Sequence, residues 1–189
     1  MTAIALPSND LFSVITTGGG DRRASWRSLL GLPDPGSAHV AFDSGSQRGI
    51  WAARLDEAVL RADKPVLLVA NGESCFAAAW WARLSPASYV SRVAGALLVD
   101  PLGRSVDPEA EERFISPRIA LPFPSAVLSG SARRGEWIDR IEQLAEGWGS
   151  GVARTSDGSA WEQAQDLILR ATARVVERRM RVAETLGFA

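Results

Sequence analysis

Short apolar stretches alternate along this 189-residue chain with longer stretches in which apolar residues recur every three or four positions. The short stretches predict strands at 11–16, 39–43, 65–70, 93–100, 125–130 and 151–155. The periodic stretches predict helices near 26–30 and at 49–63, 75–84, 136–149 and 159–187. A mostly irregular segment, 101–121, separates the fourth strand from the fifth.

This alternation predicts an α/β fold in which a mostly parallel sheet lies between two helical layers, a three-layer αβα sandwich. No repeat or linker divides the chain, so we expect residues 1–189 to form a single domain. In open parallel sheets, ligands bind outside the carboxyl ends of the strands. The loops in which to look for a site are therefore 17–24, 43–48, 71–75, 100–104, 129–134 and 156–159.

Composition narrows the classes of function. A net charge of −1 argues against general affinity for nucleic acid, which needs a basic surface. One cysteine, Cys75, and one histidine, His39, exclude an internal disulfide and metal sites built from these residue types, and nothing indicates a cofactor. The start of the chain lacks the pattern of a signal peptide, and no apolar run approaches the ~20 residues of a membrane span. We therefore expect a cytoplasmic protein that does not bind membranes.

The stretch NGESC, residues 71–75, joins a predicted buried strand to an apolar helix and makes Ser74 a candidate nucleophile. A serine hydroxyl is activated by a base within hydrogen-bond reach, usually histidine. A carboxylate could act as this base only if its pKa were strongly raised, and the candidates are Asp100, Asp157 and Glu73. The alternative interpretation of Ser74 is a serine that caps the following helix.

Cys75 lies near the start of the same helix, where a thiol pKa is lowered. It is therefore a second candidate nucleophile. The alternative is a small buried side chain that contributes to packing.

Several segments, in their order and spacing, resemble the small α/β-hydrolases typified by retinoblastoma-binding protein nine and its bacterial relatives. They are SWRSLL (25–30), IWAARLDEAV (50–59), PVLLVA and CFAAAWWA (65–82), VAGALLVDP (93–101), LPFPSAVLSGS (121–131) and QLAEGWGS (143–150). The resemblance spans most of the chain. It implies an α/β-hydrolase fold and a serine hydrolase with a Ser–Asp–His triad.

The resemblance also places the nucleophile. Relatives read His-Ser-Leu-Gly-Cys before the helix, and a gapless comparison from Pro65 onward puts that serine at Gly72. Size agrees, because the residues two before and two after a nucleophile at such a turn must be small. Phe76 is too large to lie two positions after a nucleophile at Ser74, whereas Ala70 and Ser74 suit a nucleophile position at 72.

The other two triad positions also lack the expected residues, an aspartate and a histidine. The resemblance puts the acid at Ala132 and the base in the loop 155–161, TSDGSAW, which has no histidine. His39 opens the second strand, away from the strand tips, and is interpreted as a surface or core residue.

We therefore predict a hydrolase-fold protein that is catalytically inactive and binds a small ligand or a protein partner, although the sequence leaves open whether it is an enzyme. The predicted cleft is lined by Gly18, Gly19, Asn71, Gly72, Glu73, Asp100 and Arg133. The alternative is an esterase-like enzyme rebuilt around Ser74, with Glu73 or Asp157 assisting.

For two further motifs the sequence allows two interpretations each. TGGGDRR, residues 17–23, could hold an anion on backbone N–H groups or be a surface loop. Arg170, Arg174, Arg178 and Arg181 lie at helical spacing and could bind an acidic partner or form a solvated face. A third class of function is an interaction protein that acts through its helical surface, for instance as a homodimer.

Overall fold

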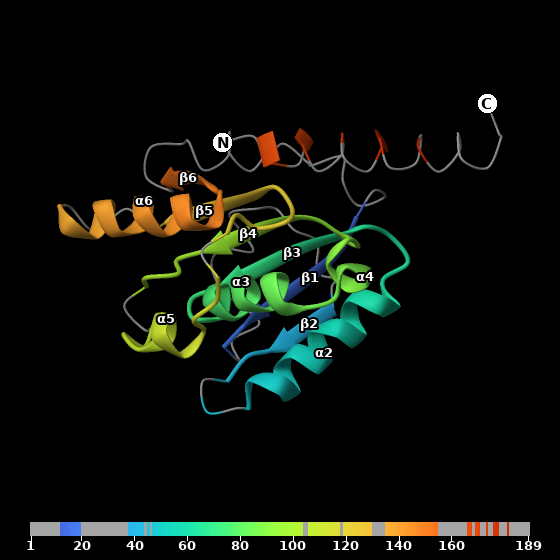
Figure 1. Cartoon of the computed structure of the whole chain (residues 1–189), viewed down its shortest axis with the longest axis horizontal. Coiled ribbons are helices and arrows are strands. Elements are labelled where there is room, and N and C mark those ends of the chain that lie inside the picture. The colour runs from blue at the N-terminus through green and yellow to red at the C-terminus, as the bar shows by residue number, and fades with distance from the viewer. Residues whose placement is uncertain are drawn as a thin grey trace, which may run out of the picture.

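A computed structural model describes residues 12–19, 38–43, 45, 47–103, 106–117, 119–129 and 135–154, together with individual positions between 166 and 181. Its centre is a six-stranded, fully parallel sheet in the order β2-β1-β3-β4-β5-β6 (Figure 1). The strands are β1 (Ser13–Gly18), β2 (Ala38–Ala41), β3 (Val66–Asn71), β4 (Val93–Val99), β5 (Ser125–Ser129) and β6 (Gly151–Arg154). All six predicted strands are confirmed, with β1 beginning and ending two residues later than expected.

The described helices are α2 (Arg48–Arg61), α3 (Ser74–Leu84), α4 (Ala87–Val90), α5 (Ala110–Arg113) and α6 (Glu136–Trp148). The structure thus confirms the helices predicted at 49–63, 75–84 and 136–149. The one-turn helices α4 and α5 were not predicted, and α5 lies within the segment expected to be mostly irregular. The helix predicted near 26–30 lies outside the described residues, as does most of 159–187.

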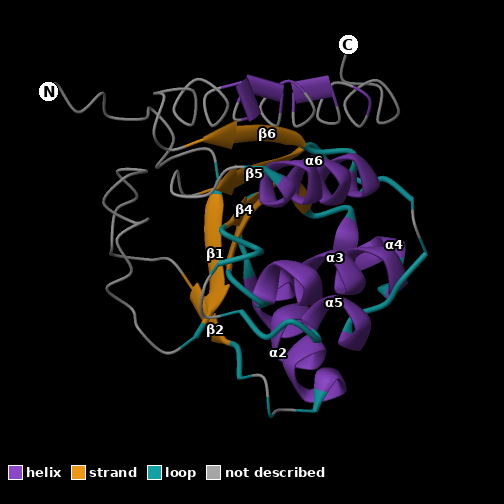
Figure 2. Ribbon diagram, turned by 90° about the vertical axis from the view of Figure 1, so that its left-hand side faces the viewer, coloured by secondary structure: helices purple, strands orange, loops and turns teal. Residues whose placement is uncertain are grey.

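The central strands β3, β4 and β5 are buried on both faces, as their uniformly apolar sequences predict. All seven residues of β4 are buried. Helices α2, α3 and α6 lie on one face (Figure 2). On the opposite face, the described residues place Leu167 in a cluster with Val69, Leu97 and Leu128. The α/β fold with a parallel sheet is therefore confirmed. No helix among the described residues is both long and apolar enough to cross a membrane.

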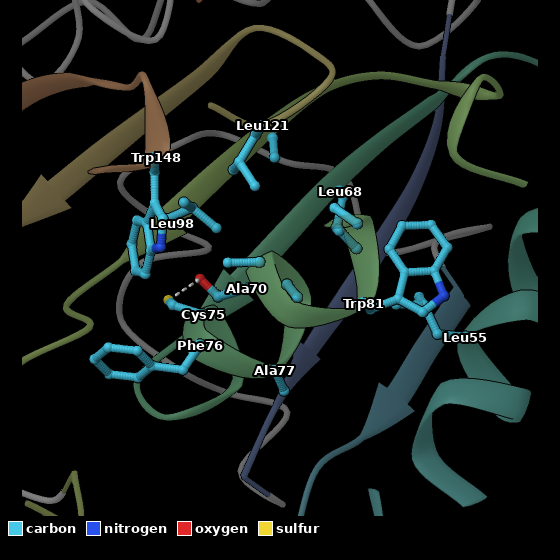
Figure 3. Close-up of a cluster of buried hydrophobic side chains, with 14 of the residues drawn as sticks. Leu55, Leu68, Ala70, Cys75, Phe76, Ala77, Trp81, Leu98, Leu121 and Trp148 are labelled. Atoms are coloured by element: carbon cyan, nitrogen blue, oxygen red, sulfur yellow. Dashed lines mark hydrogen bonds between the residues drawn. The ribbon is translucent and has the colours of Figure 1, made fainter. Parts of the chain in front are cut away.

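The core on the helical face is built around α3, whose small residues allow close contact with the sheet (Figure 3). Ala77, Ala78 and Ala79 are buried, and Trp81 is completely buried. Phe76 packs edge-on against Trp148, with ring centroids 5.6 Å apart. The α3 helix is thus held tightly, and so is the turn that precedes it.

The strand order creates a crevice at one place on the sheet. From β1 the chain moves to one side to form β2, and then crosses to the other side of β1 to form β3. Loops that leave β1 and β3 therefore diverge, and a crevice opens between their carboxyl ends. Residues 18–19 and 71–73 lie at this point.

Candidate functional site

The carboxyl ends of β1 and β3 approach each other closely at the crevice. A Cβ atom built on Gly18 would lie 3.3 Å from Cβ of Asn71, which is tighter than ordinary side-chain contact. Gly18 thus permits this approach by having no side chain. Gly19, the next residue, is exposed, and a Cβ atom built on it would have no neighbour within 4 Å.

The turn between β3 and α3 bends at Gly72, whose φ is +61°. This left-handed conformation favours glycine. The Gly72 N–H donates to the carbonyl oxygen of Val99 (2.8 Å), and the Gly72 carbonyl accepts from the N–H of Cys75 (3.1 Å). Ala70 and Ser74, two positions before and after, are both completely buried. The turn therefore has a left-handed bend at position 72 between small, buried neighbours, and no side chain at the bend itself.

The Ser74 hydroxyl is 0% exposed and serves the backbone around it. Its Oγ accepts a hydrogen bond from the N–H of Asn71 (3.0 Å). It lies within donating distance of two carbonyl oxygens, that of Asn71 (2.9 Å) and that of Thr17 in β1 (3.0 Å). The hydroxyl therefore closes the turn and ties it to β1.

Cys75 is also completely buried. Its thiol lies 3.4 Å from the carbonyl oxygen of Ala70 and 3.5 Å from that of Val99. Burial raises the pKa of the Cys75 thiol well above its ordinary value, so the group stays protonated and poorly nucleophilic.

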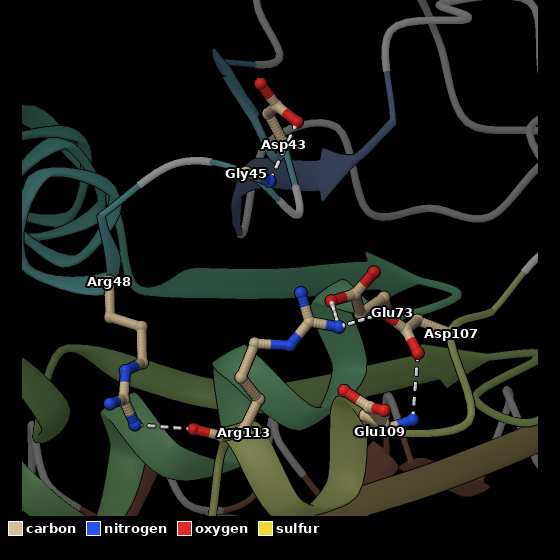
Figure 4. A network of polar contacts seen from close by, with 7 residues as sticks. All are labelled: Asp43, Gly45, Arg48, Glu73, Asp107, Glu109 and Arg113. Atoms are coloured by element: carbon tan, nitrogen blue, oxygen red, sulfur yellow. Dashed lines mark hydrogen bonds and ion pairs between the residues drawn. The ribbon is translucent and has the colours of Figure 1, made fainter.

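Glu73 extends from the turn to a polar network on the segment after β4 (Figure 4). Its Oε1 lies 3.2 Å from Nη2 of Arg113, and Arg113 also pairs with Asp107. Glu73 Oε1 is buried and, within the described residues, accepts no hydrogen bond, so the contact with Arg113 is an ion pair without hydrogen-bond alignment. Arg48 of α2 donates to the carbonyl oxygen of Arg113.

The two carboxylates that face Arg113 have pKa values shifted in opposite directions. Burial raises the pKa of Glu73, and the nearby Arg113 only partly opposes that shift. The pKa of Asp107 is lowered, chiefly because its carboxylate accepts a hydrogen bond from the backbone N–H of Glu109 (2.9 Å), and Arg113 adds to this effect.

The same segment covers Gly72. It leaves β4 through a tight turn at Asp100, which has a φ of +46° and whose carbonyl accepts from the N–H of Gly103 (2.9 Å). Beyond this turn, Cγ2 of Val106 lies 3.5 Å from the position a Cβ atom on Gly72 would take. A side chain at position 72 would therefore touch Val106 at ordinary van der Waals distance.

The structure brings together most of the residues predicted for the site. Gly18, Gly19, Asn71, Gly72 and Glu73 meet at the crevice, and Asp100 follows the neighbouring strand β4. Arg133, Ala132 and Asp157 lie outside the described residues. The sequence did not predict four residues that surround this turn: Thr17, Val106, Asp107 and Arg113. They reach positions 72–74 only through the fold, and no local sequence pattern marks such residues.

His39 takes no part in this site. It lies in β2, paired in register with Thr16, and its Nδ1 is 2.8 Å from Oγ1 of that residue. The histidine lines a hollow of about 510 Å³ at the β2 edge of the sheet, beside α2. This placement agrees with its interpretation as a surface or core residue.

The chemistry available at the turn is limited. Position 72 has no side chain, the Ser74 hydroxyl and the Cys75 thiol are buried, and Glu73 is the titratable residue beside them. Within the described part of the chain, no three histidine, cysteine or acidic residues are grouped so as to hold a metal ion.

Comparison with known proteins gives a family and a fold. A family model described as serine hydrolase matches residues 19–164, well over half of the chain. A crystal structure of a protein described as a YdeN-like hydrolase, from Pectobacterium atrosepticum, has a TM-score of 0.56 and 15% sequence identity over 77% of each chain. At this identity the likeness concerns the fold alone. No protein with a curated description matches the chain.

Proposed function

The chain belongs to the serine hydrolase family, and we propose that it is a non-hydrolytic member that binds a small ligand or a partner at the carboxyl edge of its sheet. The observation that carries this proposal is the turn at Gly72. The bend has the backbone conformation and the small neighbours that a nucleophile position needs, but glycine supplies no hydroxyl.

The surroundings of Ser74 support the absence of hydrolysis. To attack an ester, the hydroxyl must reach the substrate and lose its proton to a base. Ser74 is completely buried, and its Oγ interacts with backbone groups of Asn71 and Thr17. Exposing it would leave the Asn71 N–H without its acceptor.

The sequence around the other two triad positions supports the same conclusion. Ala132 stands where the resemblance to the small α/β-hydrolases expects an acid, and residues 155–161 contain no histidine. The one histidine of the chain contacts Thr16 on β1, and a serine nucleophile without a base gains little activation.

Binding at this edge is supported by the crevice and by Glu73. The proposed site comprises Gly18, Gly19, Asn71, Gly72, Glu73, Asp100 and Arg133. Glu73 Oε1 accepts no hydrogen bond from the described residues. That oxygen is buried beside Arg113, so a ligand would meet the 12% of the Glu73 side-chain surface that stays exposed. We therefore infer a small ligand or a protein partner that contacts this edge of the sheet.

Hydrolysis of p-nitrophenyl acetate tests the loss of activity. We expect the wild-type protein to show the same slow background rate as Ser74→Ala, and a fluorophosphonate probe to leave Ser74 unlabelled. Turnover that disappears on Ser74→Ala, or labelling at Ser74, would overturn the proposal. Gly72→Ser is the informative companion variant, because restoring the hydroxyl without a base should not restore turnover.

The same measurements decide the alternative, an esterase rebuilt around Ser74 with Glu73 or Asp157 assisting. One observation favours it: the raised pKa of Glu73 moves this carboxyl toward the range of a general base. If it is correct, Glu73→Gln should abolish turnover together with Ser74→Ala.

A further inference from the structure

A groove with a volume of about 760 Å³ is formed by α3, α5 and α6, which lie on the same face of the sheet (Figure 2). It follows one side of α6 from Glu136 to Trp148, and it follows α3 from Phe76 to Arg83. The two helices meet at its floor, where the ring of Phe76 packs edge-on against that of Trp148. A groove above two helices in contact has a shape into which a third helix can pack.

The interior of the groove is apolar and open. Besides Phe76 and Trp148, the buried ring of Phe114 and the half-buried Leu144 line it. Gly147 of α6 also lines it, and a Cβ atom built on Gly147 would have no neighbour within 4 Å. A partner can therefore approach the backbone of α6 closely at this point.

Exposed apolar side chains continue this surface beyond the groove. Ile115, which lines the groove, is 77% exposed. Ile119 is 57% exposed and Leu84 is 53% exposed. Both lie beside Arg83, since Leu84 follows it in the chain and its Nε donates to the carbonyl oxygen of Ile119 (2.8 Å). Apolar surface that extends past a groove in this way is typical of a contact with another protein.

The charged side chains are distributed unevenly along the groove. Carboxylates gather at the start of α6 and on α5, and they belong to Glu111, Glu112, Glu136 and Asp139. At the other end, Arg83 donates to the carbonyl oxygen of Gly147 (2.6 Å) and to the hydroxyl of Ser116 (2.9 Å). Gly147 lies roughly 16 Å from Glu136 along the axis of α6.

The carboxylates are only partly neutralised. Glu111 pairs with Arg140, at 3.3 Å. Glu112, Glu136 and Asp139 form no ion pair with the described residues. The groove therefore has one negatively charged end, and its other end is apolar with an arginine whose guanidinium is already hydrogen-bonded.

We propose that this groove binds an amphipathic helix of another protein that carries lysine or arginine side chains at one end. The cationic end would lie against Glu112, Glu136 and Asp139, and apolar side chains would cover Phe76 and Leu144. A helix of about eleven residues spans the roughly 16 Å between the two ends. Charge complementarity would fix how the helix is oriented, and the apolar contact would supply most of the affinity. The contact uses no residue of the proposed ligand site and does not depend on it.

A designed peptide tests the groove on the full-length protein. The peptide has about twelve residues, with lysines in its last turn, leucines at helical spacing in the remainder and a fluorescein label for anisotropy. We expect a dissociation constant of about 1–100 µM, the range of weak association, and weaker binding when the ionic strength is raised.

Two control peptides separate the charge from the apolar contact. One has glutamates in place of the lysines, and the other has serines in place of the leucines; neither should bind. The proposal is overturned if the first peptide does not bind, or if either control binds equally well. Binding of n-decylamine as tight as that of the peptide would also overturn it, because the groove would then be a site for small amphiphiles.

Charge-reversal variants locate the cationic end. Glu112→Lys and Asp139→Lys should each weaken binding of the lysine peptide by about tenfold or more, because like charges then face each other. Glu146→Lys is the matched control, since Glu146 is exposed on α6 but does not line the groove. It should bind the peptide like the wild type.

A second pair of variants tests the apolar contact. Ile115→Ser should weaken binding by about fivefold, because it removes apolar surface that the peptide would cover. Ile50→Ser makes the same change at an exposed isoleucine of α2 outside the groove and should have no effect. Because all the substituted side chains are exposed, far-ultraviolet circular dichroism should show each variant folded. Groove variants that bind the peptide like the wild type would contradict the proposal.

Discussion

Gly72 bears a conformational requirement that can be measured. Its φ of +61° lies in the left-handed region, where an L side chain costs about 1–2 kcal/mol. Cγ2 of Val106, 3.5 Å from a built Cβ atom, leaves room for a methyl group, so the cost should come from the backbone. We predict that Gly72→Ala lowers the free energy of unfolding by about 1–2 kcal/mol, measured by urea denaturation.

The matched control is Gly49→Ala, near the start of α2. A Cβ atom at Gly49 has no neighbour within 4 Å, and its φ is not left-handed. This substitution should leave stability unchanged or increase it. Equal destabilisation by both substitutions would mean that the bend at Gly72 is not conformationally restrictive.

Ser74 should matter for stability and not for chemistry. Ser74→Ala removes the acceptor of the Asn71 N–H and the link to the Thr17 carbonyl, both in buried surroundings. We predict a loss of about 1–3 kcal/mol in the free energy of unfolding. Ser88→Ala, on the exposed side of α4, should change it by less than about 0.5 kcal/mol. Similar values for the two variants would contradict a structural role of the Ser74 hydroxyl.

At the scale of elements, Arg113 links the segment after β4 to the β3–α3 turn through its ion pair with Glu73. Because burial raises the pKa of Glu73 in the folded chain, the folded state holds this proton more tightly than the unfolded state. The contribution of Glu73 to stability is then fully present below its ordinary pKa and is lost as the pH rises through its folded-state value. Asp107 behaves oppositely, since its lowered pKa gives a contribution that is lost as the pH falls.

We predict that these two carboxylates give pH dependences of opposite sign. Between roughly pH 3 and 7, Glu73→Gln should gain stability relative to the wild type as the pH rises, and Asp107→Asn should gain relative to it as the pH falls. Urea denaturation across this range measures both. Curves that run parallel to the wild type would show that neither carboxylate changes its proton affinity on folding.

The elements themselves were predictable because their hydrophobic periodicity is strong. The central strands β3, β4 and β5 are apolar stretches buried on both faces, and α6 buries one side through Ile141, Ala145 and Trp148. The one-turn helix α5 has no such period, and its position depends on Arg113 reaching Glu73, forty residues earlier in the chain. Contacts of this kind depend on the fold, so no local sequence pattern predicts them.

The candidate site was predictable to a similar extent. The size of Phe76 argued against a nucleophile at Ser74, and in the structure its ring is buried against Trp148. The bend between β3 and α3 could be placed at Gly72 because strand length and residue size are local properties. Val106 above it could not, because the tight turn at Asp100 determines where that side chain lies.

For the molecule as a whole, the strand order determines where the candidate site can be. The chain leaves β1 in one direction and β3 in the other, so the crevice forms between Gly18 and Asn71.

The same strand order has a consequence for how the chain folds. The pairing of β1 with β3 joins residues far apart in sequence, such as Ser13 with Val66, while β1 and β2 alone are a two-stranded sheet too small to be stable. During synthesis the amino-terminal strands must therefore wait until the chain has been made through Asn71. From β3 onward each strand pairs with the next one along the chain, so the pairing of β1 with β3 spans the most sequence in this sheet and carries its largest loop-closure cost.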